Sequence, residues 1–79
     1  MRLPRETSGT ELARLLGKYG YQITRQSGSH IRLTTTSKGE HHITIPAHKN
    51  LRVGTLSNIL HEVAIHFGMD KAALVKDLF

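Results

Sequence analysis

The sequence predicts an α+β fold in which two helices cover one face of a three-stranded antiparallel sheet, with a short extra helix near the C-terminal end. Three observations support this prediction: an early amphipathic segment, three consecutive segments of strand-like alternation, and a longer amphipathic segment behind them. A sheet with one apolar face must be covered, and two amphipathic helices supply the cover, so two layers follow. The 79 residues are enough for one domain over positions 1–79.

The first helix is expected over residues 9–19. Ser8 precedes Glu11 by three positions, which is the spacing of a capping box whose two side chains bond each other's backbone N–H groups. Gly20 supplies the stop. Apolar residues at intervals of three and four form the buried face: Leu12, Leu15, Leu16 and Tyr19.

Three strands are predicted over residues 21–26, 30–36 and 41–45, joined by turns at 27–29 and 37–40 into a meander. Alternation places apolar residues on the face toward the helices: Tyr21, Ile23, Ile31, Leu33, Ile43 and Ile45. It leaves a polar face open to water: Gln22, Thr24, Gln26, His30, Arg32, Thr34, His42 and Thr44.

The last third of the chain predicts a basic loop and two helices. Pro46 ends the third strand because it has no N–H to donate, and the loop spans 46–53. The second helix starts at Gly54 and ends at Gly68, and Asp70 caps a short third helix. Their buried residues are Leu56, Ile59, Leu60, Val63 and Phe67 in the second helix, and Leu74 and Leu78 in the third.

The composition favours a polyanionic partner. Eleven Lys and Arg residues give a net charge of +5 and a pI near 10.1, although a basic domain without such a partner is the alternative. No cysteine is present, which excludes disulfides and thiolate metal sites. No apolar run reaches the length of a membrane span, and residues 1–6 lack the apolar core of a secretory signal. We therefore expect a cytoplasmic protein that does not contact a membrane.

The tripeptide Gly28-Ser29-His30 is the first candidate for chemistry. A histidine can accept or donate a proton near neutral pH, as RNA cleavage requires at the 2′-hydroxyl and at the leaving oxygen. The backbone N–H groups of Gly28 and Ser29 can approach a phosphate, and Arg32 lies on the same strand face. The alternative is a surface histidine beside an ordinary turn.

Further basic residues are candidate contacts for the phosphates of an RNA, which position a nucleic acid without reading its sequence. They are Arg25, Lys38, Lys49 and Arg52. His48 follows the third strand, and it either assists His30, binds an RNA phosphate or is an ordinary solvated loop residue.

The sequence predicts neither a metal site nor another cofactor. The segment His61-Glu62 with His66 is superficially similar to a zinc-protease helix. That signature needs histidines four residues apart on one helix face, and here the separation is five.

Taken in order, the short motifs of the chain resemble the HicA family of bacterial toxins. The residues that carry the resemblance are Ser8-Gly9-Thr10-Glu11-Leu12, Leu15-Leu16, Gly20-Tyr21, Arg25-Gln26-Ser27-Gly28-Ser29-His30, Ile45-Pro46-Ala47-His48, Gly54-Thr55-Leu56 and Ile59-Leu60. The resemblance implies a fold like a double-stranded-RNA-binding domain and an endoribonuclease that cleaves mRNA, with His30 essential. It also implies a hetero-oligomer with a HicB-like antitoxin that covers this histidine. The tail over 67–79 extends beyond the resemblance.

Two other functions stay open from the residues alone. One is a module that binds structured RNA without cutting it, and the other is a basic domain that docks an acidic protein partner.

Overall fold

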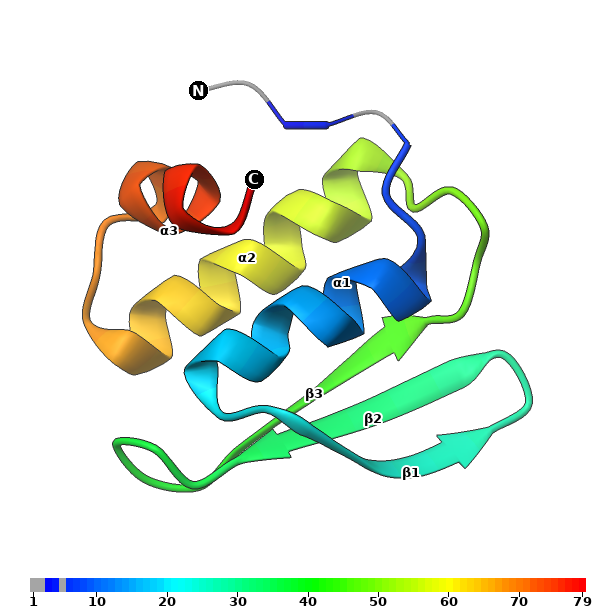
Figure 1. Ribbon diagram of the computed structural model, residues 1–79, viewed down its shortest axis with the longest axis horizontal. Helices are drawn as coiled ribbons and strands as arrows, with labels where there is room; N and C mark the ends of the chain where they lie inside the picture. The colour runs from blue at the N-terminus through cyan, green and yellow to red at the C-terminus, as the bar shows by residue number, and fades with distance from the viewer. Residues whose placement is uncertain (1–2, 5) are drawn as a thin grey trace.

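The computed structural model describes residues 3–4 and 6–79, and it confirms the predicted α+β order (Figure 1). The elements are α1 (Gly9–Leu16), the 3₁₀ turn η1 (Gly17–Tyr19), β1 (Gln22–Ser27), β2 (His30–Thr35), β3 (His41–Pro46), α2 (Val53–Phe67) and α3 (Lys71–Leu78). The strands form an antiparallel sheet in the order β1-β2-β3.

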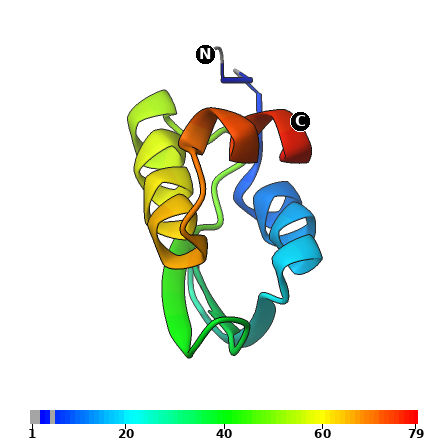
Figure 2. The same ribbon diagram turned by 90° about the vertical axis from the view of Figure 1, so that its left-hand side faces the viewer.

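The helices α1 and α2 lie side by side on one face of the sheet, and α3 crosses them on the side away from it (Figures 1 and 2). The buried apolar side chains belong to one cluster that the sheet, α1, α2 and α3 all share. Its fully enclosed members include Leu12 and Leu16 of α1, Ile31 and Leu33 of β2, Ile45 of β3, Leu56, Leu60 and Val63 of α2, and Leu74 of α3. Within residues 3–4 and 6–79, no helix covers the opposite face of the sheet (Figure 2).

Only half of the predicted capping box forms at the start of α1. The Ser8 hydroxyl accepts a hydrogen bond from the Glu11 backbone N–H at 3.0 Å, as expected. The Glu11 carboxylate does not reach back, because it pairs with Arg14 one turn further on. The helix also ends at Leu16 instead of residue 19, since the chain tightens into η1 before Gly20 turns left-handed with φ 83°.

A β-bulge at Thr24 corrects the predicted faces of β1. The register passes from Ile23 opposite Leu33 directly to Arg25 opposite Arg32, so one residue of β1 is extra. Gln26 consequently pairs with the core residue Ile31 and lies on the helix side of the sheet, whereas alternation had predicted it on the open face. Ile23 keeps its predicted side of the sheet, but its side chain is 57 % exposed. The reason is that α1 packs mainly on β2 and β3, and α2 packs mainly on β3, so the edge strand β1 is left largely uncovered.

Four further elements differ from their expected bounds by one residue at one end or at both. β1 covers Gln22–Ser27, and β3 includes Pro46, which is tolerated at the end of an edge strand. β2 ends at Thr35 and α2 begins at Val53, after the cap residue Arg52. Gly68 ends α2 in the left-handed region with φ 62°, as predicted.

The backbone of α1 begins in contact with the segment that follows β3. Gly9 N–H donates to the His48 carbonyl at 3.0 Å, and Leu51 N–H donates to the Thr7 carbonyl at 2.8 Å. A Cβ atom on Gly9 would lie 2.0 Å from the Pro46 carbonyl oxygen. Only glycine therefore permits this approach of the two backbones.

The C-terminal helix is bound to the rest of the fold at both of its ends. Asp77 accepts hydrogen bonds from Tyr19 at 2.5 Å and Lys18 at 2.9 Å, and Lys71 bonds Ser57 of α2. Partial burial and the bond to Asp77 raise the pKa of Tyr19 to about 12. The tail that the sequence left without a role is thus a packed part of the helical layer.

In the part of the chain that the structure describes, no helix has the length and apolar character of a membrane span. The prediction that no secretory signal opens the chain rests on residues 1–6, and positions 1, 2 and 5 lie outside the described residues.

We predict that Gly9→Ala lowers the free energy of unfolding by about 1–3 kcal/mol, because the added methyl group forces the α1 and Pro46 backbones apart. Urea unfolding measures the change. Gly17→Ala is the matched control, since its backbone is helical and no atom lies within 4 Å of the new Cβ. Equal stability of both variants would contradict the tight approach at Gly9.

Candidate functional site

His30 is the first residue of β2 and its side chain is exposed. It lies opposite Ser27 on one side and Pro46 on the other, so it occupies the middle strand at one end of the sheet. Because Ile31 and Leu33 point into the core, His30 and Arg32 share the open face, as alternation predicted. The ring makes no side-chain hydrogen bond to any described residue.

The loop before His30 is a two-residue hairpin formed by Gly28 and Ser29. Gly28 has φ 57°, a positive value that glycine adopts without strain and that two-residue hairpin loops need at their first central position. A Cβ on Gly28 would meet no atom within 4 Å, so the space beside it is open. The hairpin tip can therefore be approached closely by a ligand.

His48 lies beside this hairpin through backbone contacts. Ala47 N–H donates a hydrogen bond to the Ser29 carbonyl at 2.6 Å. His48 is the residue after Ala47, and His30 is the residue after Ser29. The backbones of the two histidines are therefore held next to each other by this bond. The bond from Gly9 then fixes the His48 carbonyl on its other side. The side chain of His48 is exposed, while this bond holds its backbone carbonyl.

Lys49 and Arg52 extend the positive charge of this end of the molecule. Both are exposed in the loop between β3 and α2, and Arg52 is the cap residue of α2. Among the described side chains none caps the α2 N-terminus, so the first N–H groups of the helix and the positive end of its dipole add to the field of these cations. This end therefore attracts anions.

Arg25 joins the open face through the β1 bulge. It lies directly opposite Arg32, and both side chains are exposed. Strict alternation from Ile23 would have pointed Arg25 toward the helix side instead. The structure thus brings together His30, Arg32, Arg25, Gly28 and Ser29, with His48, Lys49 and Arg52 in the adjoining loop.

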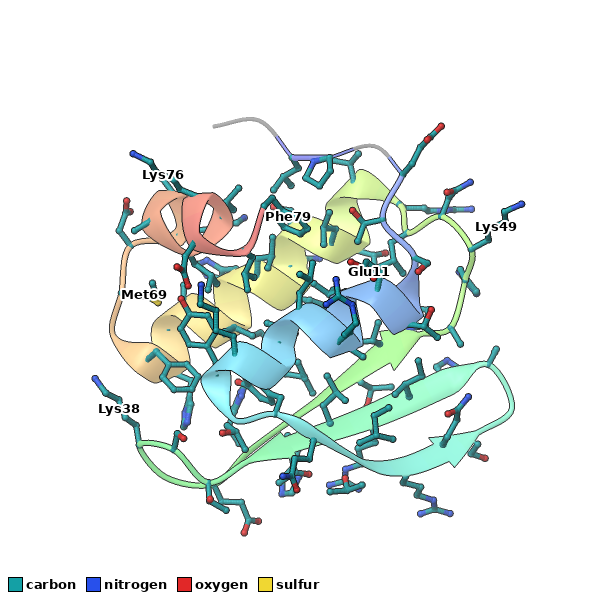
Figure 3. All side chains as sticks on the ribbon, in the orientation of Figure 1. Glu11, Lys38, Lys49, Met69, Lys76 and Phe79 are labelled. Carbon is teal, nitrogen blue, oxygen red and sulfur yellow. The ribbon has the colours of Figure 1, made fainter. Side chains whose placement is uncertain are left out.

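Lys38 does not belong to this group. It lies in the turn between β2 and β3, where its ammonium donates to the Phe67 carbonyl at the end of α2. Figure 3 shows Lys38 and Lys49 at opposite ends of the molecule. A ligand centred on His30 would have to cover the length of β2 to reach Lys38.

A chain of hydrogen bonds on the open face was not foreseen from the sequence. The hydroxyls of Thr24 and Thr34 lie 3.0 Å apart, and Thr34 lies 2.7 Å from His42 Nδ1. The other ring nitrogen of His42 bonds Glu40 at 2.8 Å. Alternation placed Thr24, Thr34 and His42 on this face, but the contacts depend on strand register.

A pocket of about 310 Å³ lies at the other end of β3, lined by His41, Glu62, Ile65 and His66. The rings of His41 and His66 stack with centroids 4.6 Å apart, and His41 Nδ1 bonds the Tyr21 hydroxyl at 2.7 Å. Burial and the charge of Glu62 raise the pKa of Tyr21 to about 12. Since His30 pairs with Pro46 and His41 begins β3, this pocket is remote from His30.

Metal-ligating side chains do not converge in either place. Among residues 3–4 and 6–79, no group of three or more His, Asp or Glu side chains is placed to hold a metal ion.

Comparison with models of known protein families gives a match over most of the chain. A family model described as the HicA toxin of bacterial toxin-antitoxin matches residues 9–65, which includes every site residue predicted above and excludes α3. No curated protein and no solved structure matches the chain.

We predict that acidification destabilises the fold through His41. Partial burial, and then the neighbouring His66 ring, lower the pKa of His41, while the charge of Glu62 opposes the shift. The folded state therefore binds fewer protons than the unfolded chain, and stability falls as the pH drops from about 7.5 to about 5. Urea unfolding at several pH values measures the fall.

His41→Gln should show a smaller loss of stability over this range. His61→Gln, which replaces an exposed histidine of α2, serves as the control and should keep the parent's loss. If His41→Gln keeps it as well, the pH dependence originates elsewhere.

Proposed function

Because the chain belongs to the HicA toxin family, we propose that it is an endoribonuclease that cleaves mRNA, with His30 as a proton-transfer residue. Membership makes the protein the toxin of a toxin–antitoxin system, and such a system implies an antitoxin partner. The observation that supports cleavage at this place is the exposed His30 on an open sheet face, between Arg32 and a glycine hairpin.

The proposed reaction is an internal displacement at a phosphodiester. His30 accepts the proton of a 2′-hydroxyl, the O2′–P bond forms, and the P–O5′ bond breaks. A second group must protonate the departing 5′ oxygen. We assign this role to His48, because the Ala47–Ser29 hydrogen bond anchors its backbone beside the hairpin.

Charge on the phosphate oxygens rises in the transition state, and hydrogen-bond donors aimed at them stabilise it. The backbone N–H groups of Gly28 and Ser29 are the proposed donors to the cleaved phosphate, and Arg32 on the strand face is proposed to hold the RNA beside it. Lys49 and Arg52 would bind further phosphates of the RNA from the adjoining loop without reading its bases.

We further propose that the domain over 1–79 is of the double-stranded-RNA-binding type. The helix, three antiparallel strands and second helix support this likeness. The proposed antitoxin is HicB-like, covers His30 and forms a hetero-oligomer with the toxin. Because mRNA is the proposed substrate, the cytoplasm is the proposed location.

A second function, RNA binding without cleavage, is favoured by one observation. Catalytic histidines are commonly oriented by a hydrogen bond to a carboxylate or carbonyl, and the ring of His30 bonds no described residue. Intact RNA after long incubation with the protein, together with a mobility shift that weakens steeply with salt, would establish this second function.

We predict that His30→Ala slows cleavage of a long RNA by about 10²-fold or more, since the variant loses a proton-transfer group. The assay uses purified protein with a chelator present and follows fragment lengths on a gel. Because His30 is exposed, the variant should fold like the parent.

His61→Ala is the control, as this histidine is exposed on α2 away from the hairpin. Growth arrest on expression provides an independent readout and should disappear with His30→Ala only. Cleavage by His30→Ala at the parent's rate would refute the assignment of His30.

A further inference from the structure

We infer that Arg25 and Arg32 together form a subsite for one RNA phosphate, namely the neighbour of the phosphate that is cleaved at His30. The inference rests on the proposed function for the identity of the ligand. It extends that function by fixing a minimum substrate, a single strand with two consecutive phosphates at this face.

The β1 bulge builds the subsite. With Thr24 as the extra residue, Arg25 moves into register with Arg32 and onto the face that carries His30. The Thr24 hydroxyl lies 3.0 Å from the Thr34 hydroxyl and 3.4 Å from the Arg32 carbonyl oxygen. Thr24 thereby pins the bulge to β2 and acts as a positioning residue for both arginines.

The charge arrangement points to an anion between the two side chains. Like charges directly opposite each other in a sheet are unfavourable. Among the described residues, neither Arg25 nor Arg32 forms a salt bridge. Glu40 is the acidic residue near the open face, but its carboxylate pairs with His42. His42 lies opposite Thr34, two residues along β2 from Arg32. A phosphate would remove the repulsion and accept paired hydrogen bonds from each guanidinium.

The position of the pair sets which phosphate it binds. Arg32 follows His30 by two residues on β2, a distance of about 6.6 Å along an extended strand. This step is comparable with the separation of neighbouring phosphates along one RNA strand. A phosphate beside His30 therefore places the next one over Arg25 and Arg32, which lie side by side.

The test compares short RNAs on the His30→Ala protein, which binds without the proposed cleavage. A uridine trinucleotide carries two phosphates and a dinucleotide carries one, and NMR chemical-shift titration gives both dissociation constants. We expect Arg25→Ala and Arg32→Ala each to weaken trinucleotide binding by about tenfold, the lower range for a hydrogen bond to a charged group. The double variant should be little weaker than either single one, since both arginines bind the same phosphate.

Two further variants separate the subsite from general charge. Lys76→Ala removes an exposed positive charge from α3 and should leave trinucleotide binding unchanged. Thr24→Val should weaken the trinucleotide and not the dinucleotide, because it frees the bulge while keeping every charge. Thr24→Ser should restore binding, as the hydroxyl returns.

Losses that multiply in the double variant, or a Lys76→Ala loss equal to that of the arginine variants, would overturn a shared phosphate subsite. No loss in either arginine variant would do the same. If the parent protein fails to cleave RNA while the coupled losses persist, the proposed function is wrong and the subsite stands.

Discussion

The close approach of two backbones at Gly9 is the constraint on which the candidate site depends. It sets the start of α1 against Pro46 and Ala47, and the same segment bonds the β1–β2 hairpin through Ala47 and Ser29. Three parts of the chain that are distant in sequence thus meet at one end of the molecule. His30 and His48 both lie at this junction, so their relative position depends on backbone contacts more than on side-chain packing.

The two faces of the sheet show how one short domain combines a packed core with an open basic surface. The helices cover β2 and β3, and the buried residues of these strands supply the core: Ile31, Leu33, Ile43 and Ile45. The edge strand β1 is exposed throughout, so its conformation is not dictated by core packing. That freedom lets β1 accommodate a bulge at Thr24, which increases the positive charge of the open face. Bulges commonly re-aim side chains near functional sites.

The end of the molecule away from His30 has a different role. There α3 packs on α1 and α2, and the stacked rings of His41 and His66 join the sheet to the end of α2. In each of these contacts one partner lies beyond the end of the family match at residue 65: Asp77 of α3 or His66 of α2. The C-terminal tail consequently adds to the stability of the helical layer and leaves the basic end uncovered.

The fold order and half of the site could be predicted from the sequence because they follow from neighbouring residues. Alternation in β2 is unbroken, so Ile31 and Leu33 on one side placed His30 and Arg32 on the other. The turn at Gly28 and the helix stop at Gly68 follow from the left-handed backbone that glycine tolerates.

The tertiary structure alone decided the rest. The side of the sheet on which Arg25 lies depends on the bulge at Thr24, whose hydroxyl bonds Thr34 of the neighbouring strand. The position of the His48 backbone depends on a hydrogen bond from Gly9, which lies almost forty positions earlier in the chain. The exposure of Ile23 depends on where the helices end over the sheet. Local preferences act over a few residues, whereas these contacts form between segments that are brought together only when the core closes. The sequence by itself therefore determined the order of elements and the position of His30, and packing decided which cations surround it.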